Sequence, residues 1–365
     1  MPAELRLHIG PFKTGSTSIQ QTLVAARSQL SEAGVLYPRV KDRSYSHQEP
    51  VCGFLVQAGL TTGPPVMLGL QTYLRSNPGP KLHAWRDLNQ QISAHAGPAL
   101  ISAEMLASLP GEAVKEFLDV LAVRPVQVVM VQRRASRLLP SWYQETAKME
   151  PVADFETFAR AAIADLLRDE ITPSSFLNTG EVAARWADAG CDVHVVDARN
   201  CLDDQVLNEA LSLLVPETAL TVRRHSNPGM SAVGTRLWQA YSQLHPFRLR
   251  AVGRSLRRRL TATFDIIADP ELGGRLALTE RAAATLDACV KGPGDAQSLH
   301  ALIDGYEPVT RTIPGSTTLD EAQRREIFTH LRRWHHLEEA RWGAVDLGVR
   351  ASGRCGLTPS PFTGR

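Results

Sequence analysis

The stretch "ELRLHIGPFKTGSTSIQQTL", residues 4–23, decides the fold, because it passes from a strand through a glycine-containing turn into a helix. Residues 4–9 are predicted as a short strand, and Ile19, Leu23 and Leu30 keep the spacing of one helix face. A strand that enters such a turn and then a helix points several backbone N–H groups and the positive end of the helix dipole at one spot. The segment therefore predicts a phosphate site.

The lysine of this turn does not stand where nucleoside-triphosphate loops place it. Gly10 and Gly15 keep the spacing of G-x-x-x-x-G-K-[ST], but Lys13 comes before the second glycine. A lone glycine-rich turn is more often a tight turn capped by Ser or Thr, which is the structural alternative here. The lysine and the hydroxyl residues at 16–18, directly after a strand, favour a phosphate loop.

The turn resembles a known loop. The K-[ST]-G-[ST]-[ST] core of the 5′-phosphosulfate loop in sulfotransferases that use 3′-phosphoadenosine 5′-phosphosulfate (PAPS) is matched by Lys13, Thr14, Gly15, Ser16 and Thr17. In that family the lysine contacts the oxygen that bridges phosphorus and sulfur. The resemblance implies that Lys13 neutralises charge on the leaving phosphate, and that the N–H groups from Thr14 to Ser18 hold the 5′ end of the nucleotide.

A second segment carries the other element of that family, an arginine and a serine eight residues apart after a core strand. In "VVMVQRRASRLLPSWYQ", residues 128–144, Arg133 stands at the strand end and Ser141 on the following helix. The resemblance implies that they bind the 3′-phosphate, which suits a planar guanidinium fork and a hydroxyl. The structural alternative is a solvated strand end and a helix-surface serine. The "SWYQ" within this segment is similar to the sulfotransferase domain of the heparan N-deacetylase/N-sulfotransferases.

The general base that sulfuryl transfer needs has two candidates. Glu104 ends the predicted strand "PALISAE", residues 98–104, where the family places a histidine or a glutamate. A strand-end glutamate is about as often an N-cap or a salt-bridge partner. His47 in "SYSHQEP" is the rival, although a lone histidine in a polar loop is usually only solvated.

Composition limits the class of protein. The chain has 365 residues, 43% hydrophobic and 21% charged, with a net charge of +2, so no overall field points to nucleic acid. Five cysteines without a C-x-x-C pair suit a reducing compartment, and no cluster has metal-ligand spacing. Since neither a signal peptide nor a transmembrane run is visible, we expect a cytoplasmic protein without a required metal.

Further strands are predicted at 125–133 and 192–198, with helices at about 111–122, 136–147 and 179–190 between and around them. Alternation of this kind predicts an α/β fold, a P-loop-like core with a central parallel sheet flanked by helices. Residues 41–97 show weak periodicity apart from a helix near 81–97. The expected domains are a PAPS-binding core, 1–240, and a helical C-terminal extension packed on it, 241–365.

The expected function is transfer of a sulfuryl group from PAPS to a hydroxyl of a carbohydrate or glycosylated metabolite, leaving 3′-phosphoadenosine 5′-phosphate. Weaker similarities extend the resemblance over most of residues 5–235, but the basic segment 222–231 does not match the family's 3′-phosphate clamp. The basic run at 248–260 is either a patch that attracts an acidic glycan or lipid surface or, more simply, the solvent-exposed face of a helix. Two alternatives are a variant P-loop kinase or NTPase and an inactive nucleotide fold that binds partners. A kinase of this kind requires a lysine directly after the second glycine of the loop, which this sequence lacks.

Overall fold

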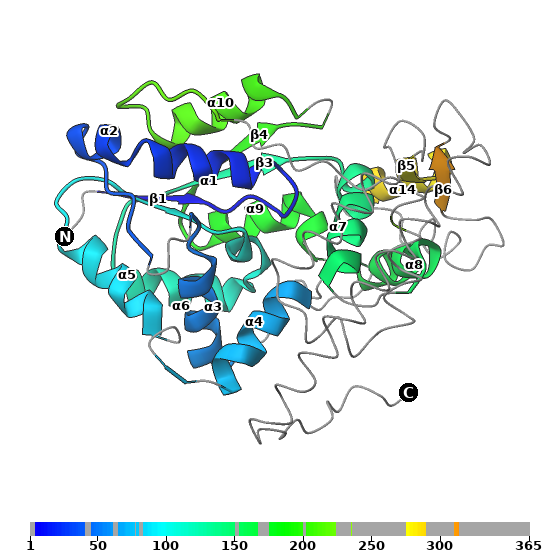
Figure 1. Cartoon of the computed structure of the whole chain (residues 1–365), viewed down its shortest axis with the longest axis horizontal. Helices are drawn as coiled ribbons and strands as arrows, with labels where there is room; N and C mark the ends of the chain where they lie inside the picture. The colour runs from blue at the N-terminus through cyan, green and yellow to red at the C-terminus, as the bar shows by residue number, and fades with distance from the viewer. Residues whose placement is uncertain are drawn as a thin grey trace, which may run out of the picture.

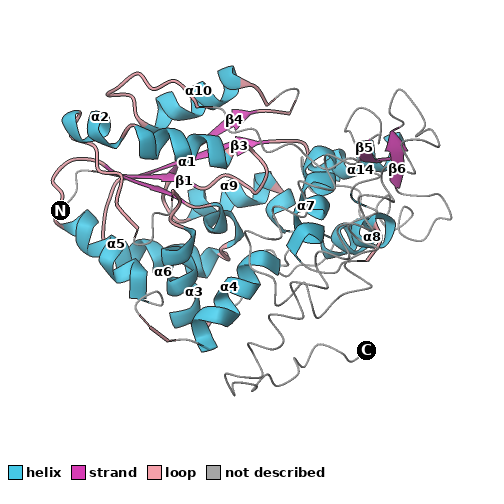
Figure 2. Cartoon of the chain, viewed as in Figure 1, coloured by secondary structure: helices cyan, strands magenta, loops and turns pink. Residues whose placement is uncertain are grey.

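The structure is a computed structural model, and it describes residues 4–40, 45–60, 65–76, 78–79, 83–149, 153–166, 175–199, 202–223, 235, 275–289 and 310–313. Within these residues lies a mixed α/β fold with a central parallel sheet covered by helices on both faces (Figures 1 and 2). None of the helices in this part of the chain is long and apolar enough to cross a bilayer.

The central sheet has four strands in the order β2-β1-β3-β4, and every neighbouring pair is parallel. Leu5 of β1 is aligned with Ala99 of β2 on one side and with Val126 of β3 on the other. The four strands predicted from the sequence are confirmed to within two residues at each end; they are β1 (Leu5–His8), β2 (Ala99–Ser102), β3 (Val126–Gln132) and β4 (Asp192–Asp197).

Each face of the sheet packs on its own group of helices, because successive residues of a strand point to opposite faces. In β3, Val128 and Met130 belong to one hydrophobic cluster, whereas Val129 and Val131 belong to the other. The second cluster is closed by α1 (Ser16–Ala25), α2 (Arg27–Glu32) and α10 (Asp204–Leu214). The first is closed mainly by α3 (Gln48–Gln57), α5 (Ala84–Ser93), α6 (Gly111–Leu121), α7 (Ala135–Met149), α8 (Phe155–Leu166) and α9 (Thr179–Asp188).

The region between the first two strands is more ordered than the sequence predicts. It contains α3, α4 (Pro65–Ser76) and α5, of which only α5 was expected. Helix α3 is buried almost all round and contains Pro50 and Gly53, so it has neither a polar face nor good helix propensity. A helix of that kind gives no 3.6-residue periodicity, and its stability comes from tertiary packing.

The C-terminal third is described only in part. Strands β5 (Arg275–Leu278) and β6 (Thr310–Ile313) form an antiparallel pair, and α14 (Glu280–Cys289) packs on α7. The extension that the sequence predicts as helical therefore also contains an antiparallel pair of short strands among its described residues, beside the helix α14. The expected domain boundary at 240 and the basic run at 248–260 lie outside the described residues.

A buried arginine fastens β1 to the end of α10. Arg6 donates to the Glu4 carboxylate at 2.8 Å, to the Glu217 carboxylate at 2.7 Å and to the carbonyl of Leu214 at 3.2 Å. The hydrogen bond from Arg6 holds the pKa of Glu217 below its ordinary value. Because that pKa is lowered on folding, the stabilisation is present above the unfolded pKa of 4.5 and is lost as the pH falls through the folded value.

We expect Glu217→Ala to lower the free energy of unfolding by about 1–3 kcal/mol at pH 7, because the buried guanidinium keeps Glu4 but loses its second carboxylate. The difference from the wild type should shrink between pH 5 and pH 3, as Glu217 becomes protonated in the wild type. Urea unfolding at several pH values measures it, with the exposed Glu32→Ala as control. Equal stability of the wild type and Glu217→Ala at pH 7 would contradict this assignment.

Candidate functional site

The candidate site lies at the carboxyl edge of the sheet, where three loops meet. The chain leaves β1 for β2 on one side, and β3 follows on the other side of β1, so the order reverses at β1. In open parallel sheets ligands bind outside the carboxyl ends of the strands at such a reversal. The loops that meet here are residues 9–15 after β1, Ala103 and Glu104 after β2, and Arg133 and Arg134 after β3.

The loop after β1 is held open by its own backbone conformation. Lys13 has φ 69° and Gly15 has φ 85°, both in the left-handed region. The Thr14 hydroxyl donates to the carbonyl of Pro11 at 2.7 Å, which closes the turn. A side chain on Gly15 would come within 2.6 Å of a Leu207 methyl, so glycine is needed there for conformation and for space. Left-handed geometry at a lysine costs energy, and such strain is concentrated at functional sites.

The N–H groups at the start of α1 face the interior of this loop. Those of residues 14–17 donate to no acceptor in the described part of the chain, as expected for the first turn of a helix. The N–H of Ser18 instead donates to the carbonyl of Gly15 at 2.9 Å. The Ser18 N–H, which the sequence also predicts to hold the nucleotide, thus already has an acceptor in the first turn of α1, unlike those of residues 14–17.

The structure brings Arg133 to the backbone of Lys13. The Arg133 guanidinium donates to the carbonyl of Lys13 at 3.1 Å, across 120 residues of sequence. The Lys13 ammonium in turn pairs with the Glu145 carboxylate of α7 at 3.0 Å. Burial, and then the nearby charge of Arg137, lower the pKa of Arg133, so the cation would gain from an anionic partner.

Ser141 lies on α7, in sequence between Arg133, which precedes the helix, and Glu145, which pairs with Lys13. Its hydroxyl donates to the carbonyl of Arg137 at 3.3 Å, and among the described residues it makes no hydrogen bond to Arg133 or Lys13. Glu145, four residues later, shares its helix face and contacts Lys13. Ser141 is therefore on the side of α7 that faces the loop.

Glu104 lies beside the loop in a half-buried, hydrogen-bonded position. Its carboxylate accepts hydrogen bonds from Gln48 Nε2 at 3.0 Å and from the Ser16 side chain. Burial raises the pKa of Glu104 to about 7, against the opposing charge of Lys13, while Glu145 adds to the rise. A carboxylate that titrates near neutral pH can accept and return a proton, so the geometry and the charge suit a general base.

His47, the rival candidate for the general base, is not a solvated loop histidine. It is buried at the N-terminus of α3, with Nδ1 accepting from the N–H of Ser102 at 3.0 Å and Nε2 lying 3.2 Å from the carbonyl of Pro38. Burial lowers the pKa of His47 to about 4. With both ring nitrogens occupied, His47 serves as a structural bridge between β2 and the preceding loop.

Three residues of this site were missed from the sequence. Gln48 orients Glu104 and also accepts from the N–H of Met105 at 2.9 Å, and Glu145 pairs with Lys13. His8 is buried at the end of β1 beneath the loop. Only Glu145 had a usable sequence signal, since it lies one helical turn beyond Ser141.

The basic segment 222–231 is described only at its start. The backbone N–H of Arg223 donates to the Thr22 hydroxyl, and Arg224 lies outside the described residues.

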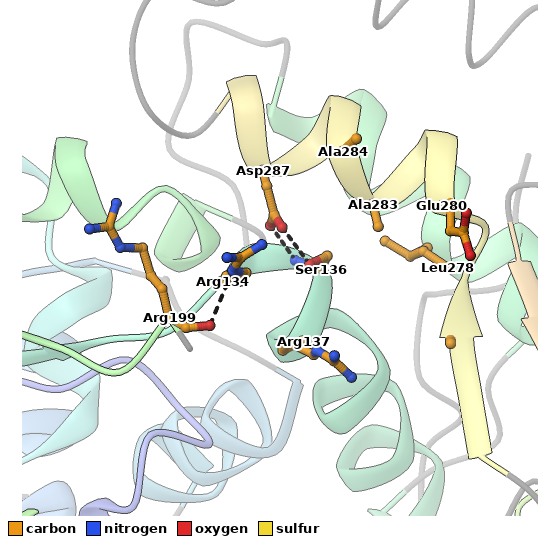
Figure 3. A pocket seen from close by; sticks show the side chains of 10 residues that line it. Arg134, Ser136, Arg137, Arg199, Leu278, Glu280, Ala283, Ala284 and Asp287 are labelled. Atoms are coloured by element: carbon orange, nitrogen blue, oxygen red, sulfur yellow. Dashed lines mark hydrogen bonds between the residues drawn. The ribbon is translucent and has the colours of Figure 1, made fainter. Parts of the chain in front are cut away.

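A pocket of about 500 Å³ lies next to this site and shares only Arg134 with the loops that form it (Figure 3). It is bounded by the first turn of α7, by Arg199 and by β5 and α14. Asp287 accepts from both the N–H and the hydroxyl of Ser136, and Arg199 pairs with Asp197. The hydrogen bonds of Asp287 therefore fasten α14 to the first turn of α7 at this pocket.

Comparison with known proteins identifies no relative. No family model and no curated protein match the chain. Among solved structures, one from the PezAT chromosomal toxin-antitoxin system of Streptococcus pneumoniae is 11% identical and covers 69% of this chain and 87% of its own, with a TM-score of 0.25. A likeness of that size carries no argument about the function of this chain.

The raised pKa of Glu104 predicts a pH-dependent stability. Between pH 4.5 and about 7 the unfolded chain loses this proton while the folded chain keeps it, so rising pH destabilises the wild type at this position. Glu104→Gln carries no such group. We expect the stability of this variant relative to the wild type to increase between pH 5 and pH 8 in urea unfolding, and a constant difference over that range would contradict the assignment.

Proposed function

We propose that the chain is a PAPS-dependent sulfotransferase with a P-loop-like core, which transfers a sulfuryl group to a hydroxyl of a carbohydrate or glycosylated metabolite. The observation that carries the proposal is the hydrogen bond from Arg133 to the carbonyl of Lys13. It joins the two sequence elements that resemble the sulfotransferase motifs, so one nucleotide with phosphates at both ends has a partner for each.

The loop suits the 5′ end of the nucleotide. The N–H groups of residues 14–17 and the dipole of α1 converge on the loop, and the Lys13 ammonium lies at its rim. Glu145 now neutralises Lys13, with both side chains partly exposed. A phosphosulfate that enters the loop would replace Glu145 as the partner of this lysine, at low cost because an exposed ion pair is weak.

Arg133 and Ser141 suit the 3′-phosphate. A guanidinium has five N–H donors, and Arg133 commits one nitrogen to the loop carbonyl, so the same side chain is able to hold the loop and meet a phosphate. Burial and Arg137 both disfavour its charge, and a dianion would relieve that cost. The Ser141 hydroxyl, on the same face of α7 as Glu145, would add a further hydrogen bond.

Glu104 would take the proton of the acceptor. The acceptor oxygen attacks sulfur, the bond between sulfur and the bridging oxygen breaks, and the proton passes to the Glu104 carboxylate. Negative charge then develops on the 5′-phosphate, where Lys13 and the loop N–H groups stabilise it. Gln48 and Ser16 fix the Glu104 carboxylate for this step.

Nucleotide preference tests the proposal. We expect calorimetric titration of the full chain to show binding of 3′-phosphoadenosine 5′-phosphate without magnesium and weaker binding of ATP with magnesium. Lys13→Ala and Arg133→Ala should each weaken the bisphosphate by tenfold or more, since each removes a charged hydrogen-bond donor. The exposed Arg86→Ala on α5 is the matched control and should bind as the wild type does. A preference for ATP with magnesium would favour a kinase or NTPase.

Turnover tests the role of Glu104. With PAPS and a panel of methyl glycosides as acceptors, we expect Glu104→Gln to bind the nucleotide normally but to release 3′-phosphoadenosine 5′-phosphate at least a hundredfold more slowly. The rate of the wild type should rise with pH through about 7, as Glu104 ionises. Glu112→Gln, an exposed glutamate of α6, is the control. Full activity of Glu104→Gln would remove this residue from the mechanism.

A further inference from the structure

Gly10 leaves an unusual polar space beneath the loop. Its φ is not in the left-handed region, so its backbone does not require glycine. A Cβ atom at this position would lie 3.0 Å from His8 Nε2, 3.0 Å from Thr14 Oγ1 and 3.2 Å from Ser16 Oγ. Contacts this short would crowd a side chain at position 10 against all three polar atoms, so glycine keeps a side chain out of the space that they border. The missing side chain therefore keeps open a space bordered by three polar atoms.

His8 points a hydrogen-bonding atom into this space. The residue is fully buried, and its Nδ1 lies 2.7 Å from the Ser102 hydroxyl. Its Nε2 is buried and has no hydrogen-bond partner in the part of the chain that the structure describes. Burial lowers the pKa of His8 to about 4, so the ring is neutral at pH 7. A buried polar atom without a partner is costly, and such atoms in folded proteins usually meet water or a ligand.

The neighbouring hydroxyls limit which nitrogen carries the proton. The Thr14 hydroxyl donates to the carbonyl of Pro11 and lies 3.5 Å from the Ser16 hydroxyl, and the Ser16 side chain interacts with Glu104. Ser102 contacts both His8 Nδ1 and the Tyr37 side chain. When Ser102 donates to Nδ1, the ring proton lies on Nε2, where it can be donated to an acceptor beneath the loop. The proposal requires this tautomer.

We propose that His8 Nε2 forms a buried oxyanion subsite under the loop and donates to one oxygen of a bound phosphate group. The inference rests on the proposed function, in which that phosphate is at the 5′ end of the nucleotide. Gly10 lets the oxygen approach, the N–H groups of residues 14–17 bind the other oxygens from above, and neutral His8 adds a donor without adding charge. Inorganic phosphate has the same chemistry and would occupy the same subsite.

Two substitutions of His8 separate the nitrogens. In His8→Gln the side-chain amide nitrogen can replace Nε2, whereas His8→Asn reaches only the Nδ1 position and retains the bond to Ser102. We expect calorimetric titration with 3′-phosphoadenosine 5′-phosphate and with inorganic phosphate to show affinity near the wild type for His8→Gln and a loss of tenfold or more for His8→Asn. Thermal unfolding of both variants checks that the fold is kept.

A measurement on the unmodified protein guards against variants that fail to fold. Nitrogen-15 NMR of the His8 ring should show the proton on Nε2, and the Nε2 resonance should shift when inorganic phosphate is added. A proton on Nδ1, no response to phosphate, or wild-type affinity in His8→Asn would each overturn the proposal. If inorganic phosphate binds through His8 but the bisphosphate nucleotide does not bind, the subsite stands and the sulfotransferase assignment fails.

Discussion

The hydrogen bond from Arg133 to the carbonyl of Lys13 ties the two halves of the candidate site together. It is possible only because β1 and β3 are neighbours and run in the same direction, so that their carboxyl ends open onto the same edge. Glu104 arrives at that edge from β2, on the other side of β1. The parallel order of three strands thus places a lysine, an arginine and a carboxylic acid around one loop, although they lie far apart in the sequence.

The charged groups of this edge are weakly paired or shifted in pKa. Lys13 is paired with Glu145 at the protein surface, where ion pairs are weak, while desolvation raises the pKa of the half-buried Glu104 to about 7. The loop itself combines two left-handed residues, unpaired helix N–H groups and a buried neutral histidine. The N–H groups, and the His8 Nε2 proton in the tautomer proposed above, would each donate to an incoming anion.

Sequence reasoning succeeded where local pattern decides structure. The continuous apolar run of β3 and the turn at Gly15 give local signals, and the strands, the loop and α6, α7 and α9 were predicted from such signals. Helix α3 was not, because burial on all sides leaves no periodicity. The partners His8 and Gln48 could not be predicted, since tertiary packing alone brings them to the loop, whereas Glu145 lies one helical turn beyond Ser141. The burial of His47 could not be predicted for the same reason.

The account requires a single nucleotide to bind at both ends, one phosphate in the loop after β1 and the other at Arg133 and Ser141. Phosphorus-31 NMR distinguishes the two phosphates of 3′-phosphoadenosine 5′-phosphate and observes both in one sample. The account predicts that both resonances shift on binding, that Lys13→Ala mainly reduces the shift of the 5′-phosphate, and that Arg133→Ala mainly reduces that of the 3′-phosphate. A shift confined to one phosphate in the wild-type complex, or no binding at all, would contradict it.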